Sequence, residues 1–155
     1  MPTTSTENAG TAGGREQAHR LDDQVGFLLR RAYQRASANL VEKIGGHDLT
    51  PAQFATLARL YERGKVSQNL LGRLVTMERA NIRDVVQRLR KRGLVSTTRD
   101  PTDTRLIVVS LTARGRALTR ALLPVEMACT SKTLAPLDEN ERKVLYDLLR
   151  RLAAG

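Results

Sequence analysis

The sequence is poor in cysteine, histidine and aromatic residues. Cys129 is its only cysteine, His19 and His47 are its only histidines, and it has no tryptophan. One thiol cannot form an internal disulfide and too few ligands remain for a zinc site, so we expect no bound metal and a reducing compartment. No glycine-rich phosphate loop and no paired-carboxylate signature is present. We therefore expect neither an enzyme nor a bound cofactor.

Long apolar runs are also missing. No stretch approaches the roughly 20 apolar residues that a membrane-spanning helix needs. Residues 1–20 contain Thr, Ser, Gly and Glu, where a secretory signal would have a basic start followed by an apolar segment. The sequence thus predicts no membrane partner and a cytoplasmic location.

Positive charge is abundant. Lysine and arginine number 26 against 16 acidic residues, a formal net charge of +10, and 41% of the 155 residues are hydrophobic. A chain of this length and composition can bury one core, so we expect a single folded domain. Its charge indicates a polyanionic partner, and nucleic acid is the partner that fits best.

Hydrophobic periodicity divides the chain into a tail and a mostly helical domain. Residues 1–18 lack periodicity and are predicted to be a flexible N-terminal tail, and 19–155 are predicted to be one domain. A long helix is expected from about Asp22 to Ile44, where Gly45 and Gly46 stop it. The last helix should run from Asp138, with Glu141 completing a capping box, to Leu152.

The middle of the chain predicts a compact run of short elements. Thr50, followed by Pro51, caps a helix that ends at Gly64, and Ser67 caps a helix of about two turns, 68–74. Thr76 is expected to cap the next helix, which reaches about residue 92. Two β-branched runs, 94–98 and 106–110, predict a hairpin around the charged loop 99–105.

Thr112 should begin a further helix that Pro124 kinks early or interrupts. The aromatic residues occur within the predicted helices, so we expect most of them to belong to the core rather than to a base-stacking surface. The fold class expected is therefore all-α with a small β-wing.

A helix, a turn, a second helix and a charged hairpin follow one another here, and this order is typical of proteins that bind duplex DNA. The second helix of such a pair lies in the major groove, the first braces it, and the hairpin reaches the neighbouring minor groove. Asn pairs well with adenine and Arg with guanine, so Asn81 and Arg83 are expected to read bases. Ser67, Gln68 and Arg88 are expected mainly to position the backbone. The predicted DNA-binding residues are Ser67, Gln68, Arg79, Asn81, Arg83, Asp84, Gln87, Arg88, Asp103 and Arg105.

The hairpin loop carries the more specific signal. Its sequence, Asp100-Pro101-Thr102-Asp103-Thr104-Arg105, places a carboxylate two residues before an arginine. Asp103 can orient the Arg105 guanidinium by a bidentate pair. An arginine held in this way suits a narrow, electronegative minor groove.

With these motifs the chain from about Leu21 to Leu152 resembles the MarR family. The resemblance lies in Asp48-Leu49-Thr50-Pro51-Ala52-Gln53-Phe54, in Leu89-Arg90-Lys91-Arg92-Gly93-Leu94-Val95, and in residues 100–105 followed by Ser110-Leu111-Thr112 and Gly115. It implies a winged helix-turn-helix, at about 50–110, flanked by dimerisation helices at about 22–44 and 112–155. It also implies a homodimer, a palindromic operator and a small aromatic effector. The function expected is that of a sequence-specific transcriptional repressor that such an effector releases.

The sequence departs from the usual family pattern at Asn81 and Arg83, so no operator sequence carries over from the resemblance. For an aromatic carboxylate effector, Arg20 and Arg31 with Phe27 between them offer cations and a ring, and His19 and His47 are weaker candidates. Cys129 lies far from the chain start, where the peroxide-sensing branch of the family has its reactive cysteine, and is expected to be inert. An architectural protein that binds DNA without sequence preference is the alternative that the net charge also allows.

Overall fold

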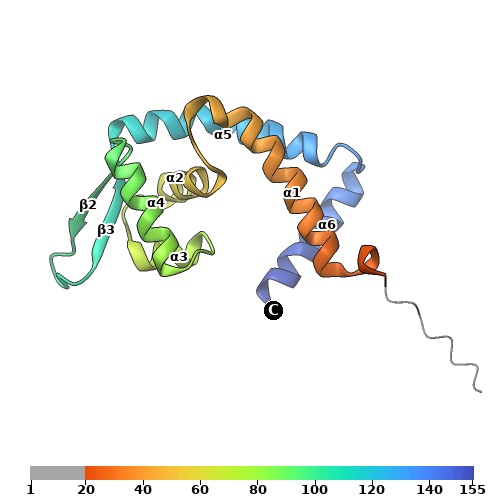
Figure 1. Ribbon diagram of the computed structural model, residues 1–155, viewed down its shortest axis with the longest axis horizontal. Coiled ribbons are helices and arrows are strands. Elements are labelled where there is room, and N and C mark those ends of the chain that lie inside the picture. Colours follow the sequence, from red (N-terminus) through yellow and green to blue (C-terminus); the bar gives the residue numbers. More distant parts are fainter. Residues whose placement is uncertain (1–19) are drawn as a thin grey trace, which may run out of the picture.

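The computed structural model describes residues 20–155, so the predicted tail and His19 lie outside the described residues. The elements follow in the order η1 (Leu21–Asp23), α1 (Val25–Ile44), η2 (Gly45–His47), α2 (Pro51–Arg63), β1 (Val66–Ser67), α3 (Gln68–Leu74), α4 (Arg79–Lys91), β2 (Val95–Arg99), β3 (Ile107–Leu111), α5 (Ala113–Thr133) and α6 (Glu139–Ala154). In Figure 1, α2, α3, α4 and the strands gather at one end of the molecule, α1 and α6 lie at the other, and α5 connects the two ends. The expected all-α fold with a small β-wing is confirmed.

Helices α2, α3, α5 and α6 begin where side chains satisfy their free backbone N–H groups. The Thr50 hydroxyl accepts a hydrogen bond from the N–H of Gln53, whose side chain returns the bond in a capping box. Asp138 and Glu141 make a second capping box at α6. Each such cap contributes about 1 kcal/mol. These predicted helix starts are confirmed, as are the caps at Ser67 and Thr112.

The prediction that Thr76 caps α4 is wrong. The helix begins at Arg79 after Glu78, whose side chain makes no capping hydrogen bond. Thr76 instead has a φ of +56°, and the N–H of Met77 donates to the carbonyl of Gly72 at 2.8 Å. Many helices end in this way, with one residue in the left-handed conformation and a backbone hydrogen bond from the N–H of the next residue. Thr76 therefore terminates α3 rather than starting α4.

Pro124 does not interrupt its helix, so that part of the expectation is wrong, whereas the kink stays a prediction. α5 is continuous from Ala113 to Thr133 with Pro124 inside it. The proline removes the N–H that would bond to the carbonyl of Arg120. Both residues are exposed, so water can hydrogen-bond to the freed carbonyl and the helix continues.

The wing is a three-stranded antiparallel sheet in the order β1-β3-β2, rather than the two-stranded hairpin that the sequence predicts. β2 and β3 each begin one residue later than expected, and Thr97 lies opposite Val109. The unexpected strand, β1, pairs Val66 with Val109. It was missed because two residues are too few to produce an alternating pattern.

The core lies within the winged module. Phe54, Leu57 and Leu60 of α2 pack with buried residues of α3, α4 and the sheet, and Leu122 of α5 completes the cluster. Phe54 is the only aromatic residue among these buried side chains of the described chain, whereas Tyr33 and Tyr146 are 68% and 41% exposed. The expectation that most aromatic residues belong to the core is therefore wrong.

No helix among residues 20–155 combines the length and the apolar character that a bilayer crossing requires.

Candidate functional site

The outward face of α4 is polar and mostly cationic. Its apolar residues Ile82, Val86 and Leu89 are buried against the core, which leaves the opposite side of the helix to solvent. The exposed polar residues of this face are Arg79, Asn81, Arg83, Asp84, Gln87 and Arg88. Each residue predicted to contact DNA from this helix is thus accessible to solvent.

The start of α3 lies beside this surface. Ser67 and Gln68 are partly exposed, and the Ser67 hydroxyl accepts a hydrogen bond from the N–H of Leu70 at 3.4 Å. Gln68 lines a shallow hollow together with Arg83 and Gln87 of α4. The helix start is therefore next to the cationic face, as in a helix-turn-helix.

Two arginines at the end of α4 hold this helix in place, a role that was not predicted from the sequence. The Arg90 guanidinium donates to the Thr97 hydroxyl of β2 at 3.2 Å. Arg92 donates to the carbonyls of His47 and Asp48 in the α1–α2 connection. These bonds fix α4 relative to the wing on one side and to the segment before the start of α2 on the other.

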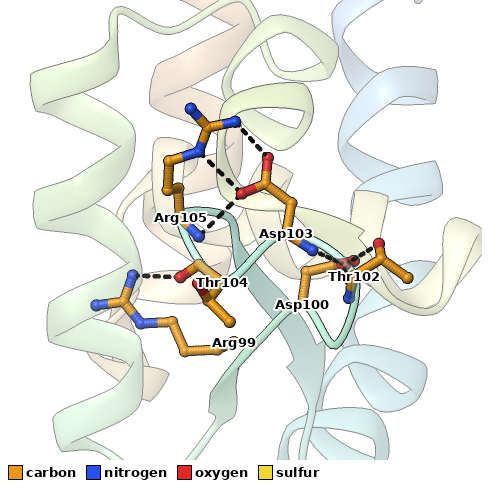
Figure 2. A network of polar contacts seen from close by, with 6 residues as sticks. All are labelled: Arg99, Asp100, Thr102, Asp103, Thr104 and Arg105. Atoms are coloured by element: carbon orange, nitrogen blue, oxygen red, sulfur yellow. Dashed lines mark hydrogen bonds and ion pairs between the residues drawn. The ribbon is translucent and has the colours of Figure 1, made fainter.

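The loop between β2 and β3 is ordered by its own side chains, as Figure 2 shows. The Arg105 guanidinium donates to both oxygens of the Asp103 carboxylate, at 3.0 and 3.1 Å, and its backbone N–H donates to the same carboxylate. The predicted bidentate pair is thus present in the structure. The side chain of Arg105 is 89% exposed, against 33% for Asp103, so the pair points the cation outward from the hairpin tip.

Asp100 and Arg99 complete the wing loop. One carboxylate oxygen of Asp100 accepts hydrogen bonds from the Thr102 hydroxyl and from the N–H groups of Thr102 and Asp103. Arg99 donates to the carbonyl of Thr104 at 3.1 Å. Asp and Asn commonly order turns in this way, so the residue types at 100–103 carry the signal for this network.

The pKa values of the two aspartates reflect this network. The side-chain hydrogen bond from Arg105, followed by its backbone N–H, holds the pKa of Asp103 below its ordinary value. The Thr102 hydroxyl, followed by the N–H groups of Asp103 and Thr102, lowers the pKa of Asp100. Both carboxylates are therefore ionised at neutral pH and available to hold the loop.

The predicted effector residues within the described range lie on the surface. Arg20 is 3.9 Å from Asp23 and Arg31 is 3.7 Å from Asp22. The Arg31 guanidinium carbon is 6.0 Å from the centroid of the Phe27 ring. Arg31 and Phe27 thus lie together, whereas His47 is in η2 and contributes its carbonyl to Arg92.

A cavity of about 680 Å³, which was not predicted from the sequence, lies between the long helices and the winged module. It is lined by Tyr33, Ala36, Ser37 and Leu40 of α1, Pro51, Ala52 and Ala55 of α2, Val75, Thr76 and Met77 of the α3–α4 turn, Glu126, Cys129, Thr130 and Thr133 of α5, Leu134, and Tyr146 of α6. Its volume falls within the range of small-molecule sites. None of Arg20, Phe27, Arg31 and His47 lines it.

The wall of this cavity formed by α1 and α5 is cross-linked by polar contacts. The side-chain amide of Asn39 donates to the Thr133 hydroxyl at 3.0 Å. The backbone carbonyl of Asn39 accepts a hydrogen bond from the Cys129 thiol at 3.4 Å. Lys132 pairs with Glu42 at 3.2 Å. These contacts hold the two long helices side by side, so a molecule in the cavity would touch a fixed wall and the α3–α4 turn at once.

Apolar side chains are exposed on α1 and α6. The larger ones on these two helices are Val25, Leu28, Leu29, Tyr33, Val41, Val144, Tyr146, Leu148, Leu149 and Leu152, each between 38% and 68% exposed. Exposed apolar residues concentrated on two long helices are typical of a protein interface.

Comparison with known proteins agrees with this architecture. A family profile described as the MarR family matches residues 49–107. The HTH-type transcriptional repressor NicR of Pseudomonas putida is 38% identical over 130 residues, which are 84% of this chain and 82% of NicR.

Two solved structures are also similar. A probable transcriptional regulator from Pseudomonas aeruginosa is 48% identical, with a TM-score of 0.81 over 86% of this chain and 99% of that one. BpsR of Bordetella bronchiseptica, whose DNA binding is regulated by 6-hydroxynicotinic acid, is 36% identical, with a TM-score of 0.84 over 88% of this chain and 98% of that one. The chain belongs to the MarR family of winged helix-turn-helix, DNA-binding transcriptional regulators.

Proposed function

We propose that this chain is a homodimeric repressor that binds a palindromic operator through α4 and the wing loop, and that a small aromatic acid releases it. The observation that carries the DNA-binding part is the Asp103–Arg105 pair, which aims an exposed guanidinium outward at the tip of the hairpin. A recognition helix in the major groove places such a hairpin near the adjacent minor groove. Arg105 is the side chain that enters it.

The exposed residues of α3 and α4 divide into two roles. Asn81 and Arg83 read base edges in the major groove, where their amide and guanidinium groups match adenine and guanine. Ser67, Gln68 and Arg88 contact the backbone and set the register. Arg79, Asp84 and Gln87 lie on the same exposed face of the recognition helix and complete the contact surface.

Dimerisation is supported by the exposed apolar side chains of α1 and α6. A second copy of the chain would cover them and would place two recognition helices on one DNA face. Dimers of helix-turn-helix proteins bind half-sites about one helical turn apart, so the operator would be palindromic.

The effector part rests on the cavity between α1, α2, α5 and the α3–α4 turn. BpsR, which shares this fold and 36% of its residues, responds to an aromatic acid. A ligand here would contact both the long helices and the turn that leads into α4. It would release DNA by favouring an arrangement of α4 that no longer fits successive major grooves, to the extent that it binds that arrangement more tightly.

Arg20, Phe27 and Arg31 are a second position for the acid. Their cations and ring suit an aromatic carboxylate. Arg20 directly precedes η1, and Phe27 and Arg31 lie on α1 near the proposed dimer interface. His47 is a weaker contributor to that position, and so is His19, which lies outside the described residues. The two positions are distinguished by substitution.

The DNA-binding proposal is tested by selecting bound sequences from a random DNA library with the full-length protein. We expect a palindrome that remains bound against excess random DNA. An architectural binder would yield no consensus and would lose its site to the competitor, and that result would overturn the proposal.

The effector proposal is tested by titrating 6-hydroxynicotinate and benzoate-type acids into the operator complex. Ala55→Phe, which fills the cavity from α2, should abolish release, whereas Arg20→Ala and Arg31→Ala should retain it if the acid lies in the cavity. The reverse pattern would locate the acid at Arg20 and Arg31. No release by any of these acids at millimolar concentration would refute this part of the proposal.

A further inference from the structure

The cavity between α1, α2 and α5 has an unusual charge. Among the residues that line it, Glu126 carries the only formal charge, and no lysine, arginine or histidine faces it from the described chain. The protein as a whole has a net charge of +10. The cavity is therefore a locally acidic site in a strongly basic molecule, the opposite of what a carboxylate ligand alone would require.

Glu126 also lacks a partner. Its side chain is partly buried, and burial, followed by repulsion from Glu62, raises its pKa. No cation or hydrogen-bond donor of the described residues is paired with its carboxylate. By contrast, the Glu62 carboxylate is held by Arg59 at 2.7 Å. No side-chain oxygen of the described residues is both buried and without a partner, so water reaches the carboxylate oxygens of Glu126. A ligand ring that displaces this water must bring a donor of its own, because the carboxylate would otherwise lose its hydrogen bonds.

The surroundings of Glu126 suit a ring with a polar edge. Ala52 and Ala55 of α2 leave room beside α5, and the rings of Tyr33 and Tyr146 also line the cavity. Thr130, one helical turn after Glu126, also lines the cavity. An aromatic ligand here would pack its faces on apolar side chains and turn its hydrogen-bonding edge toward α5.

We propose that Glu126 is a specificity-determining residue of this cavity: its carboxylate accepts a hydrogen bond from a ring O–H or N–H of the ligand, and so selects hydroxylated aromatic compounds over the parent compounds. This rests on the proposed function in taking the cavity as the effector site. It adds an orientation, because the donor edge faces Glu126 and any carboxylate of the ligand must point away from it. 6-Hydroxynicotinate has this layout, because its hydroxyl, or the ring N–H of its pyridone tautomer, lies on the ring edge away from the carboxylate.

The test measures binding by isothermal titration calorimetry to the full-length protein. Two ligand pairs differ only in one para hydroxyl: 4-hydroxybenzoate and benzoate, and the uncharged 4-hydroxybenzamide and benzamide. A third pair, 6-hydroxynicotinate and nicotinate, differs in a donor that is the hydroxyl or the ring N–H of the pyridone tautomer. A hydrogen bond to a charged acceptor predicts that the wild type prefers the hydroxylated member by about tenfold or more. In Glu126→Ala this preference should fall below about threefold, and Glu126→Gln, which keeps an uncharged acceptor, should lie between the two.

Glu62→Gln is the matched control, because it removes the neighbouring carboxylate without touching the cavity lining, and it should retain the preference. Circular dichroism and operator binding establish that each variant is folded. Equal binding of hydroxylated and parent compounds to the wild type, or an undiminished preference in Glu126→Ala, would overturn the inference. So would a Glu126→Gln protein that loses its dimer while keeping the preference, since Glu126 would then serve the interface.

The amide pair separates this inference from the proposed function. If neither acid pair binds but the hydroxylated amide does, in a manner that depends on Glu126, the acid class is wrong and the role of Glu126 stands. If the acids bind and release DNA with no Glu126-dependent preference, the effector proposal stands and the role of Glu126 fails. If none of the six compounds binds, both are refuted.

Discussion

Gly115 packs directly against the backbone carbonyl of Leu94, so closely that a Cβ at position 115 would overlap the carbonyl oxygen. The same carbonyl accepts a hydrogen bond from the N–H of Thr112 at 3.1 Å, and the Thr112 hydroxyl donates to Gly93 at 2.7 Å. The start of α5 is therefore seated on the end of the recognition helix. This contact joins α5, which leads to the exposed apolar helix α6, to the end of the DNA-facing helix α4.

We expect Gly115→Ala to lower the free energy of unfolding by about 1 to 3 kcal/mol, because the added methyl group forces the start of α5 away from Leu94. Urea denaturation followed by circular dichroism measures the change. Gly46→Ala is the control, since a Cβ there meets nothing within 4 Å, and it should change stability by less than about 1 kcal/mol. Equal stability of Gly115→Ala and the wild type would contradict the close packing.

The second prediction concerns the pKa of Asp103. Its lowered pKa means that the pair with Arg105 is intact at neutral pH, and that its contribution to loop order is lost as the pH falls through that lowered value. Arg105→Ala should therefore raise the pKa of Asp103 toward that of an ordinary aspartate. An NMR titration of the carboxyl carbon measures this. Arg99→Ala, which removes a guanidinium bonded to Thr104 instead, should leave the pKa of Asp103 unchanged.

The sequence predicted the helix-turn-helix and the wing well because short-range chemistry specifies them. Thr50, Ser67 and Asp138 satisfy N–H groups only three residues away, and such caps are visible in a linear sequence. The Asp103–Arg105 pair is equally local. Thr76 was misassigned because a left-handed helix end and a helix start use the same few residues, and only the bond from Met77 to Gly72 separates them.

The cavity could not be predicted, because its lining comes from α1, α2, α5 and α6 and converges only in three dimensions. Glu126 is unremarkable in sequence, since a glutamate in a helix is usually solvated; its partial burial and missing partner decide its importance. Cations near a ring in the sequence therefore pointed to Arg20 and Arg31, which do not line this cavity.

The third prediction separates base reading from positioning. Asn81→Ala and Arg83→Ala should each weaken operator binding by about 1 to 3 kcal/mol and change the preferred base at one position, while binding to random DNA changes less. Ser67→Ala, Gln68→Ala and Arg88→Ala should weaken operator and random DNA alike. Fluorescence anisotropy with both DNAs at several salt concentrations measures this. Parallel losses on both DNAs for Asn81 and Arg83 would contradict the division.

The fourth prediction concerns the dimer. Leu148→Glu places a charge on the exposed apolar side of α6, where Leu148 is 45% exposed in the single chain. If a second copy covers this residue, the dimer dissociation constant should rise at least about tenfold, because an unpaired charge would be buried. Sedimentation velocity across micromolar concentrations measures it. Lys143→Glu, a charge change beside Glu139 on the polar side of the same helix, is the control and should leave a dimer.

The last prediction concerns the wing arginine. Arg105→Ala should weaken operator binding by roughly tenfold or more, because it removes the guanidinium that the Asp103 carboxylate aims away from the hairpin. Arg105→Lys keeps the charge but loses the planar fork that pairs with two carboxylate oxygens, so it should recover only part of the loss. Asp103→Asn should cost less than Arg105→Ala, since the cation remains but is no longer held in one direction. Lys143→Ala removes the same charge from α6, at the far end of the molecule from the wing (Figure 1), and should change affinity little. Each affinity is measured with the full-length protein over a salt series, and only Arg105→Ala should reduce the salt dependence by about one ion. Wild-type affinity for both Arg105→Ala and Asp103→Asn at every salt concentration would show that the wing loop does not contact DNA.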